Sequence, residues 1–285
     1  MGQYPAIGCK IFHKKEVLIV LVVLVISLFF LCPLSVAQAY NRSSAIVLMD
    51  ADNGEILYSE NANVKMEIAS TTKVLTAITA IRNGDVFSQV AIPKQAEGIE
   101  GSSIYLRTGE TWQLSDLLYG LMLRSGNDAA DAIAWKVGGS RENFIRLMNQ
   151  TAVLSGATQS SFTNPHGLHD ENHYSTASDM ARITAFALKN SLFREIVKTK
   201  THRCVKEGEN GREKVVFYNK NKLLYSYPYA VGVKTGYTKH SGRCLISAAE
   251  KQGKTLICVV LNVGDTYGVS KSLFEKYLPA DKKSE

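Results

Sequence analysis

The order of strand and helix patterns along the chain restricts its fold more than any other feature of the sequence. Two β-rich runs, AIVLMD and EILYSE, flank Asp52-Asn53-Gly54, and Asn-Gly is a strong hairpin signal. Apolar residues at helical spacing fill the middle of the chain, and β-rich runs return after about residue 200. We therefore predict an α/β fold of the α+β type. One antiparallel sheet, joined by the first and last strands, is flanked by helices and accompanied by an all-helical lobe.

Caps and breakers set the expected bounds of the individual elements. The first helix runs from Ser70 to about Arg82 and is stopped by Asn83-Gly84. The other expected helices are two within 114–139, interrupted around Ser125-Gly126, then 140–156 capped by Ser140, 175–190 with Thr176 and Asp179 spaced as a capping box, and 269–278. The expected late strands are THRCVKE, EKVVFYN, AVGVKTGYT, RCLISAAE and KTLICVVLNV. No repeat or low-complexity linker divides them, so residues 40–280 are predicted to form one domain.

Residues 1–39 have the features of a secretory signal peptide. A basic start is followed by an apolar run from Val17 to Leu31 and by Ala37-Gln38-Ala39, a pattern that signal peptidase cleaves. An uncleaved membrane anchor is the alternative, but the apolar run is short for a full span. We expect cleavage after Ala39 and a location outside the cytoplasmic membrane, secreted or in the cell envelope.

Charge and cysteine content argue against several classes of partner. The formal net charge is +7, without a dense Lys/Arg block interleaved with aromatics, so no nucleic-acid partner is expected. Cys204, Cys244 and Cys258 follow the leader, and their odd number prevents complete internal pairing. A Cys244–Cys258 disulfide is one alternative, but we favour buried free thiols. No cysteine has the spacing of a zinc site.

Three histidines lie close together in PHGLHDENHYS: His166, His169 and His173. They suggest a metal site, but the segment is a loop marked by Pro and Gly, where sequence spacing sets no common face. We favour a structural loop beside the active cleft and expect neither metal nor cofactor.

The stretch EIASTTKVLTA carries the first sign of chemistry. Ser70 precedes Lys73 by three residues, which places both side chains on one helical face within hydrogen-bonding reach. A lysine can take a serine proton only when its amine is neutral, and burial or a second cation favours that form. On this spacing alone, Ser70 as a helix cap with Lys73 in solvent is the more common arrangement, and both interpretations stay open.

Two further motifs favour catalysis. Ser125-Gly126-Asn127 falls at a break between helices, where a hydroxyl and an amide can point into a cleft. Lys234-Thr235-Gly236 ends an apolar β-rich run, and Gly236 leaves room for a substrate backbone at the strand edge. Ser-x-x-Lys, Ser-Asp-Asn and Lys-Thr-Gly form the active-site set of penicillin-binding proteins and class A β-lactamases. Here the middle motif is Ser-Gly-Asn.

With these motifs, and with NPHGLHDENHYSTASDMARI, the sequence resembles the serine D-alanyl-D-alanine carboxypeptidases. These are the low-molecular-mass penicillin-binding proteins of peptidase family S11, and the resemblance covers about residues 43 to 275. It implies a β-lactamase/transpeptidase-like fold. Many members of this family carry a second β-rich domain and an amphipathic C-terminal anchor. This sequence stops at LFEKYLPADKKSE, so we expect no C-terminal β domain here.

The resemblance also implies a role for each motif residue. Ser70 is the nucleophile, Lys73 its base, and Ser125 passes a proton to the leaving amine. Asn127 holds Lys73 and a substrate amide. The remaining implied binding residues are Lys234 and Thr235 for the substrate carboxylate, Gly236 at the strand edge, and Tyr237, whose N–H joins that of Ser70 in the oxyanion hole. Arg243, expected at the start of the neighbouring strand, either forks onto the same carboxylate or is an exposed strand-edge residue.

The expected function is that of a secreted, penicillin-sensitive DD-carboxypeptidase in peptidoglycan biosynthesis, affecting the cell wall and cell shape. It removes the terminal D-alanine from stem pentapeptides ending in D-Ala-D-Ala, and β-lactams inhibit it covalently. A class A-like β-lactamase is an alternative, but no Glu-x-x-x-Asn segment supplies its deacylating base. A non-catalytic penicillin-binding sensor is the other. A vegetative and a sporulation role remain equally compatible with the sequence.

Overall fold

The computed structural model describes Gly2 and residues 43–280, and the contacts group residues 41–285 into one compact unit. Apart from Gly2, the predicted signal peptide lies outside the described residues, so its cleavage remains a prediction. No helix in the described part of the chain is long and apolar enough to cross a bilayer.

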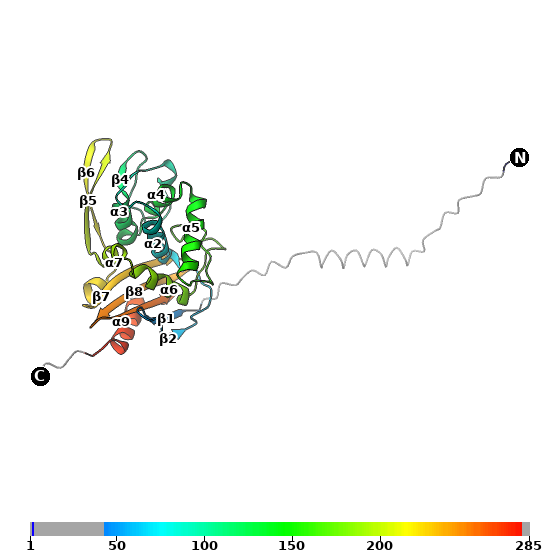
Figure 1. Ribbon diagram of the computed structural model, residues 1–285, viewed down its shortest axis with the longest axis vertical. Helices are drawn as coiled ribbons and strands as arrows, with labels where there is room; N and C mark the ends of the chain where they lie inside the picture. Colours follow the sequence, from blue (N-terminus) through cyan, green and yellow to red (C-terminus); the bar gives the residue numbers. More distant parts are fainter. Residues whose placement is uncertain (1, 3–42, 281–285) are drawn as a thin grey trace. The chain divides into compact units, whose positions relative to one another are not determined.

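The larger sheet has five antiparallel strands in the order β2-β1-β9-β8-β7 (Figure 1). Its strands are β1 (Ala45–Asp50), β2 (Ile56–Glu60), β7 (Ala230–Thr238), β8 (Gly242–Lys251) and β9 (Lys254–Leu261). Strand β1 pairs with both β2 and β9, so the predicted hairpin and the predicted adjacency of first and last strands are confirmed. In the part of the chain that the structure describes, β7 has only β8 as a partner and forms one edge.

Both faces of this sheet are covered at its centre, which explains why β1 and β9 are buried along almost their whole length. On β1, Val47 and Met49 face the larger core, whereas Ile46 and Leu48 face a smaller one on the opposite side. The smaller core includes Phe274, and the helix that carries it, α9 (Thr266–Tyr277), contacts β8 and β9. The closing helix is therefore where it was predicted.

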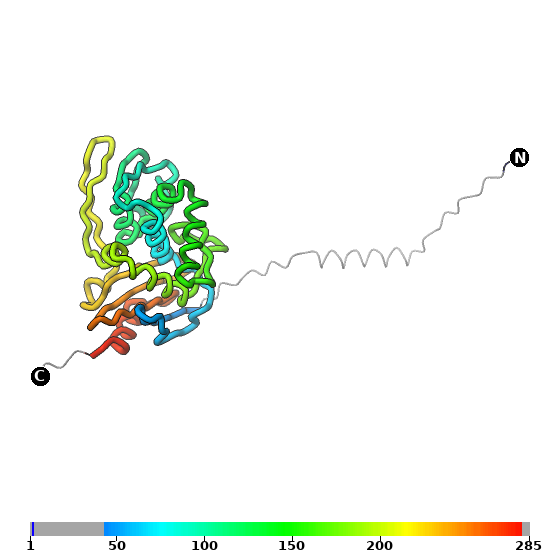
Figure 2. Tube along the Cα trace, in the orientation of Figure 1, coloured from blue at the N-terminus to red at the C-terminus, as the bar shows by residue number. Residues whose placement is uncertain are grey.

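A second sheet corrects the prediction that all late strands join one sheet. Its four strands have the order β3-β4-β5-β6, and their bounds are β3 (Gln89–Ala91), β4 (Thr111–Gln113), β5 (Thr201–Gly208) and β6 (Gly211–Tyr218). Most β5 and β6 side chains are partly or fully exposed, so these strands lack the apolar surface that a doubly covered sheet requires. Their hairpin projects away from the larger sheet beside the helices (Figure 2). The expected all-helical lobe thus also contains strands.

The remaining helices follow the predicted segments in order, except that the helices over 191–198 and 223–226 were not predicted. Their bounds are α2 (Lys73–Asn83), α3 (Leu114–Tyr119), α4 (Asn127–Gly138), α5 (Arg141–Leu154), α6 (Ala177–Leu188), α7 (Ser191–Lys198) and α8 (Leu223–Ser226). Shorter turns are the 3-10 turns η1 (Ala69–Thr72) and η2 (Lys94–Ala96) and the π-helical turn η3 (Gly120–Arg124). Helix α2 contacts α4, α5 and α6, so it runs through the centre of the helical layer.

Local signals behaved largely as predicted. Ser140 and Thr176 cap α5 and α6 through their side-chain oxygens. The Thr176 capping box is only half formed, because the Asp179 carboxylate accepts instead from Gln159 N and Ser160 Oγ. The three cysteines after the leader are buried free thiols, as favoured over a disulfide.

Candidate active site

Ser70 and Lys73 lie at the junction of η1 and α2, beneath the edge strand β7. Lys73 is fully buried, and its Nζ lies 2.9 Å from Ser70 Oγ. The alternative in which Lys73 points into solvent is therefore wrong. Two glycines allow neighbouring chain segments to close on η1. A Cβ at Gly236 would lie 3.2 Å from Ser70 N, and one at Gly167, whose φ is +83°, would lie 1.9 Å from Ala69 O. The missing side chain of Gly236 thus makes room for the segment that carries the serine.

Three oxygen atoms surround the Lys73 amine. Besides Ser70 Oγ, Nζ lies 2.6 Å from Asn127 Oδ1 and 2.7 Å from the carbonyl oxygen of His166. The two carbonyl oxygens can only accept hydrogen bonds, whereas a hydroxyl can also donate one. A neutral amine has two N–H donors and one lone pair, so it can satisfy both carbonyls and accept the Ser70 hydrogen. The arrangement suits a base that is neutral before reaction.

Burial is the main cause that lowers the pKa of Lys73 well below its ordinary value, and the charge of Lys234 adds to it. The negative charges of Asp128 and Asp131 oppose this shift, and Lys220 contributes in the lowering direction. Lys73 thus has the two features that a lysine base needs, a dry environment and a nearby cation.

Ser125 and Lys234 form the second pair of the site. The Lys234 Nζ donates to Ser125 Oγ at 3.0 Å and to Thr235 O at 2.8 Å, and only 1% of Lys234 is exposed. Burial, followed by the charge of Lys220, lowers the pKa of Lys234 to about 7. Ser125 ends η3 in the left-handed region, with φ of 65°. That unusual backbone turns the chain between η3 and α4, at the predicted helix break.

Asn127 is the first residue of α4 and connects Lys73 to the loop before α3. Its Nδ2 donates to Glu100 O at 2.5 Å, while its Oδ1 accepts from Lys73. The neighbouring Asp128 carboxylate accepts from Ile104 N and from Ser103 Oγ, which fixes the same loop. The predicted contact of Asn127 with Lys73 is confirmed. One of the two hydrogens on Asn127 Nδ2 is used within the protein, in the hydrogen bond to Glu100 O.

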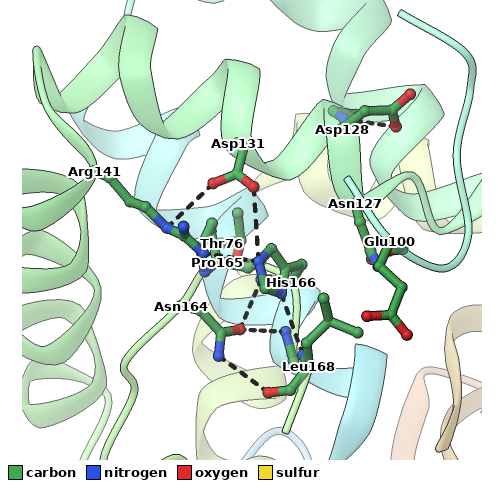
Figure 3. Close-up of polar contacts among 12 residues, drawn as sticks. Thr76, Glu100, Asn127, Asp128, Asp131, Arg141, Asn164, Pro165, His166 and Leu168 are labelled. Carbon is green, nitrogen blue, oxygen red and sulfur yellow. Dashed lines mark hydrogen bonds and ion pairs between the residues drawn. The ribbon is translucent and has the colours of Figure 1, made fainter. Parts of the chain in front are cut away.

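The His166 carbonyl was missed by sequence reasoning, because a main-chain acceptor has no residue-type signature. A buried network holds its loop (Figure 3). Pro165 O accepts from Thr76 Oγ1 at 2.6 Å, and Arg141 lies 2.9 Å from the His166 Nε2. The Asp131 carboxylate lies 3.3 Å from Arg141 Nε and 3.7 Å from the same imidazole nitrogen. Burial raises the pKa of Asp131 to about 6 and lowers that of His166 to about 2.

The backbone of β7 presents polar groups at the open sheet edge. Glu250 N donates to Tyr229 O on the β7 side of β8, so the odd-numbered residues of β8 turn their backbone groups away from β7. Tyr237 pairs with Arg243, and Thr235 with Leu245. The N–H and C=O groups of Thr235 and Tyr237 therefore face the open edge. Arg243 lies near the start of β8, the neighbouring antiparallel strand, as predicted. It pairs with Tyr237, and its exposed side chain lies on the face that Thr235 and Tyr237 share.

The three loop histidines go to three different places, so the hypothesis of a metal site formed by them is wrong. His173 Nε2 contacts Thr72 Oγ1 at 2.8 Å, and His169 Nδ1 contacts Glu67 Oε1 at 2.7 Å. The His166 ring faces Arg141. Within residues 43–280, no group of potential metal ligands contains two of the three. The loop supports the site structurally, as favoured.

Comparisons with known proteins agree on one family. The profile of peptidase family S11, described as D-alanyl-D-alanine carboxypeptidase, matches residues 33–265. The D-alanyl-D-alanine carboxypeptidase DacF of Bacillus subtilis strain 168 is 36% identical over 230 residues, covering 79% of this chain and 58% of DacF. The D-alanyl-D-alanine carboxypeptidase of Streptomyces sp. strain K15 is 36% identical over 227 residues, covering 75% of this chain and 78% of that protein.

The fold agrees as well. The crystal structure of the Streptomyces K15 DD-transpeptidase superposes with a TM-score of 0.72 at 35% identity, covering 76% of this chain and 88% of that one. The fold class expected from the sequence is thus confirmed. The chain belongs to the D-alanyl-D-alanine carboxypeptidase family, peptidase family S11.

Proposed function

We propose that this protein is a serine DD-carboxypeptidase that removes the terminal D-alanine from peptidoglycan stem pentapeptides. The observation that carries the proposal is the fully buried Lys73 amine at 2.9 Å from Ser70 Oγ, with Asn127 and His166 supplying acceptors for its N–H groups. Family membership and the names of the two relatives support the same activity.

The proposed acylation begins when Lys73 accepts the Ser70 hydroxyl proton. Ser70 Oγ attacks the carbonyl carbon between the two D-alanines, and the N–H groups of Ser70 and Tyr237 stabilise the oxyanion. The C–N bond then breaks as the proton passes through Ser125 to the leaving nitrogen. Free D-alanine departs and an ester on Ser70 remains. Water attacks the same carbon, one of its protons returns through Lys73 to Ser70 Oγ, and the ester bond breaks.

Recognition of the substrate rests on the edge of β7 and on the lysines. An extended peptide can lie along the outward-facing groups of Thr235 and Tyr237, as an added strand. The terminal carboxylate binds Lys234 and Thr235, and Arg243 reaches it from the neighbouring strand. Lys234 has a pKa of about 7, so an anionic substrate favours its protonated form and strengthens this contact. β-Lactams acylate Ser70 as slowly released inhibitors.

The proposed location is the outer side of the cytoplasmic membrane, where peptidoglycan lies. The signal-peptide pattern of residues 1–39 supports this location. No nucleic acid or cofactor takes part in the proposed reaction.

Transpeptidation is a second candidate, favoured by the printed name of the Streptomyces K15 structure, a DD-transpeptidase. Both reactions share the acyl-enzyme, and they differ in whether water or an amine attacks it. Adding a glycine-type amine acceptor to the assay separates them, because transfer produces a new amide rather than a free carboxylate.

The test uses purified protein without residues 1–39, a diacyl-Lys-D-Ala-D-Ala peptide and a fluorescent penicillin. Wild type releases D-alanine and is labelled by penicillin, whereas Ser70→Ala does neither. Ser70→Ala removes only one hydroxyl, so a matched melting temperature shows that its fold is intact. Penicillin labelling without D-alanine release contradicts the proposal in favour of a sensor, and rapid destruction of penicillin contradicts it in favour of a β-lactamase.

A further inference from the structure

Glu67, His169 and His240 converge from three separate segments beside the active site. Glu67 lies three residues before Ser70. His169 lies in the loop between α5 and α6, and His240 lies in the turn between β7 and β8. The His169 Nδ1 lies 2.7 Å and the His240 Nδ1 4.0 Å from the same atom, Glu67 Oε1. The two imidazole rings stack with centroids 4.3 Å apart and an interplanar angle of 9°. Both rings thus direct the same nitrogen toward one carboxylate oxygen.

This set has the chemistry of a transition-metal site. Two imidazoles and one carboxylate form a ligand set that zinc commonly uses, with a fourth position left for water. One ligand atom from each residue lies within 4.8 Å of the others. Ligand atoms around tetrahedral zinc are about 3.3 Å apart, given zinc–ligand distances of about 2.0–2.1 Å. The present separations lie on either side of that value, so small rotations of two partly exposed imidazole side chains complete the geometry.

The three side chains differ in burial. Only 7% of the Glu67 side chain is exposed, against 40% of His169 and 61% of His240. The carboxylate is therefore held by the core, while the imidazoles can adjust and leave a path for the ion from solvent.

A second group of potential ligands, Asp116, His202 and Cys204, is less suitable. Burial raises the pKa of Cys204 to about 12, so the thiolate that binds metal is disfavoured. The His202 ring is stacked on the Tyr119 ring with centroids 3.6 Å apart, which restricts its rotation.

We propose that Glu67, His169 and His240 bind one divalent transition-metal ion, with zinc as the preferred ion. The bound ion connects the segment before Ser70 to the turn that follows Tyr237. These two segments adjoin Ser70 and Tyr237, which carry the proposed oxyanion donors, so a bound ion fixes the relative position of the two donors. Binding to the folded state alone also stabilises it.

The test is titration of the metal-free protein with zinc chloride, followed by calorimetry and thermal melting. Wild type binds one zinc ion, and its melting temperature rises by about 5 °C at a hundredfold excess over the dissociation constant. His240→Ala and His169→Ala each weaken binding at least tenfold. Lys239→Ala changes the neighbouring exposed residue of the same turn and binds zinc like wild type.

Glu67→Gln keeps the shape of the buried side chain but removes its charge, and it also weakens binding at least tenfold. Cys204→Ala removes a ligand of the second group and leaves binding unchanged. Zinc binding that survives in His240→Ala but disappears in Cys204→Ala overturns the proposal, as does a wild type that binds no zinc at micromolar concentrations. These readouts do not depend on D-alanine release, so they remain decisive whether or not the carboxypeptidase activity is found.

Discussion

Replacing Lys234 with methionine removes a buried positive charge while keeping much of the side-chain volume. Lys234 is 1% exposed, and burial lowers its pKa from 10.5 to about 7. A lysine whose pKa is lower in the folded state binds fewer protons there than in the unfolded chain, between about pH 7 and 10.5. The free energy of unfolding of wild type therefore rises with pH in this window, and Lys234→Met lacks that contribution.

The magnitude follows from the two pKa values. Integrating the proton difference from pH 7 to pH 10 gives about 3.5 kcal/mol of stability gained by wild type through Lys234 alone. The charge of Lys234 also lowers the pKa of Lys73. The variant therefore has a higher Lys73 pKa, and the acid limb of its acylation rate moves to higher pH.

Urea unfolding at pH 7 and pH 10 measures the first effect, and penicillin acylation across pH measures the second. Lys239→Met removes an exposed lysine and serves as the control, with the pH dependence of wild type. Equal pH dependence of unfolding in wild type and Lys234→Met would refute the reasoning, because it would mean that burial does not perturb Lys234.

Three further changes test individual contacts of the site. Asn127→Ala removes the acceptor 2.6 Å from Lys73 Nζ, and we expect penicillin acylation, measured by stopped-flow, to slow about 10- to 100-fold. An unchanged acylation rate would contradict a role for this contact. Gly236→Ala places a Cβ 3.2 Å from Ser70 N, and we expect slower acylation together with about 1–3 kcal/mol of destabilisation in urea, whereas wild-type values in both assays would show that the segment yields freely. Asp131 is 1% exposed with a pKa raised from 3.8 to about 6, so the native state binds more protons between these values and stability falls as pH rises through them. In urea unfolding at pH 7, Asp131→Asn should therefore have a free energy of unfolding about 3 kcal/mol above that of wild type, and most of this difference should be lost near pH 4. A variant less stable than wild type at pH 7 would contradict the assignment.

Features that depend on neighbouring residues were predictable from the sequence. The Ser70–Lys73 contact follows from helical spacing, and the hairpin at Asn53-Gly54 follows from turn chemistry. The placement of Lys234 beside Ser125 does not follow from local rules, because 109 residues separate them. The resemblance to a known family implied that Ser125 and Lys234 share one site, and the structure brings them together.

Features that depend on packing or on main-chain atoms were missed. The separate sheet of β5 and β6 depends on pairing with β4, a strand of only three residues. The His166 carbonyl on Lys73 has no counterpart in residue type. Glu67 and His240 meet because η1 packs against β7. The sequence shows no sign of this contact, so only the histidines within one loop were considered as metal ligands.

The protonation state of the Lys73 amine tests the central claim most directly. Protein labelled with 13C at lysine Cε, compared with Lys73→Arg to assign the signal, gives the titration of this one amine by NMR. We predict that the Lys73 amine loses its proton well below the ordinary range for lysine, and that Lys234→Met shifts this titration to higher pH. An amine that stays protonated up to the ordinary lysine range would contradict the proposal that Lys73 activates Ser70.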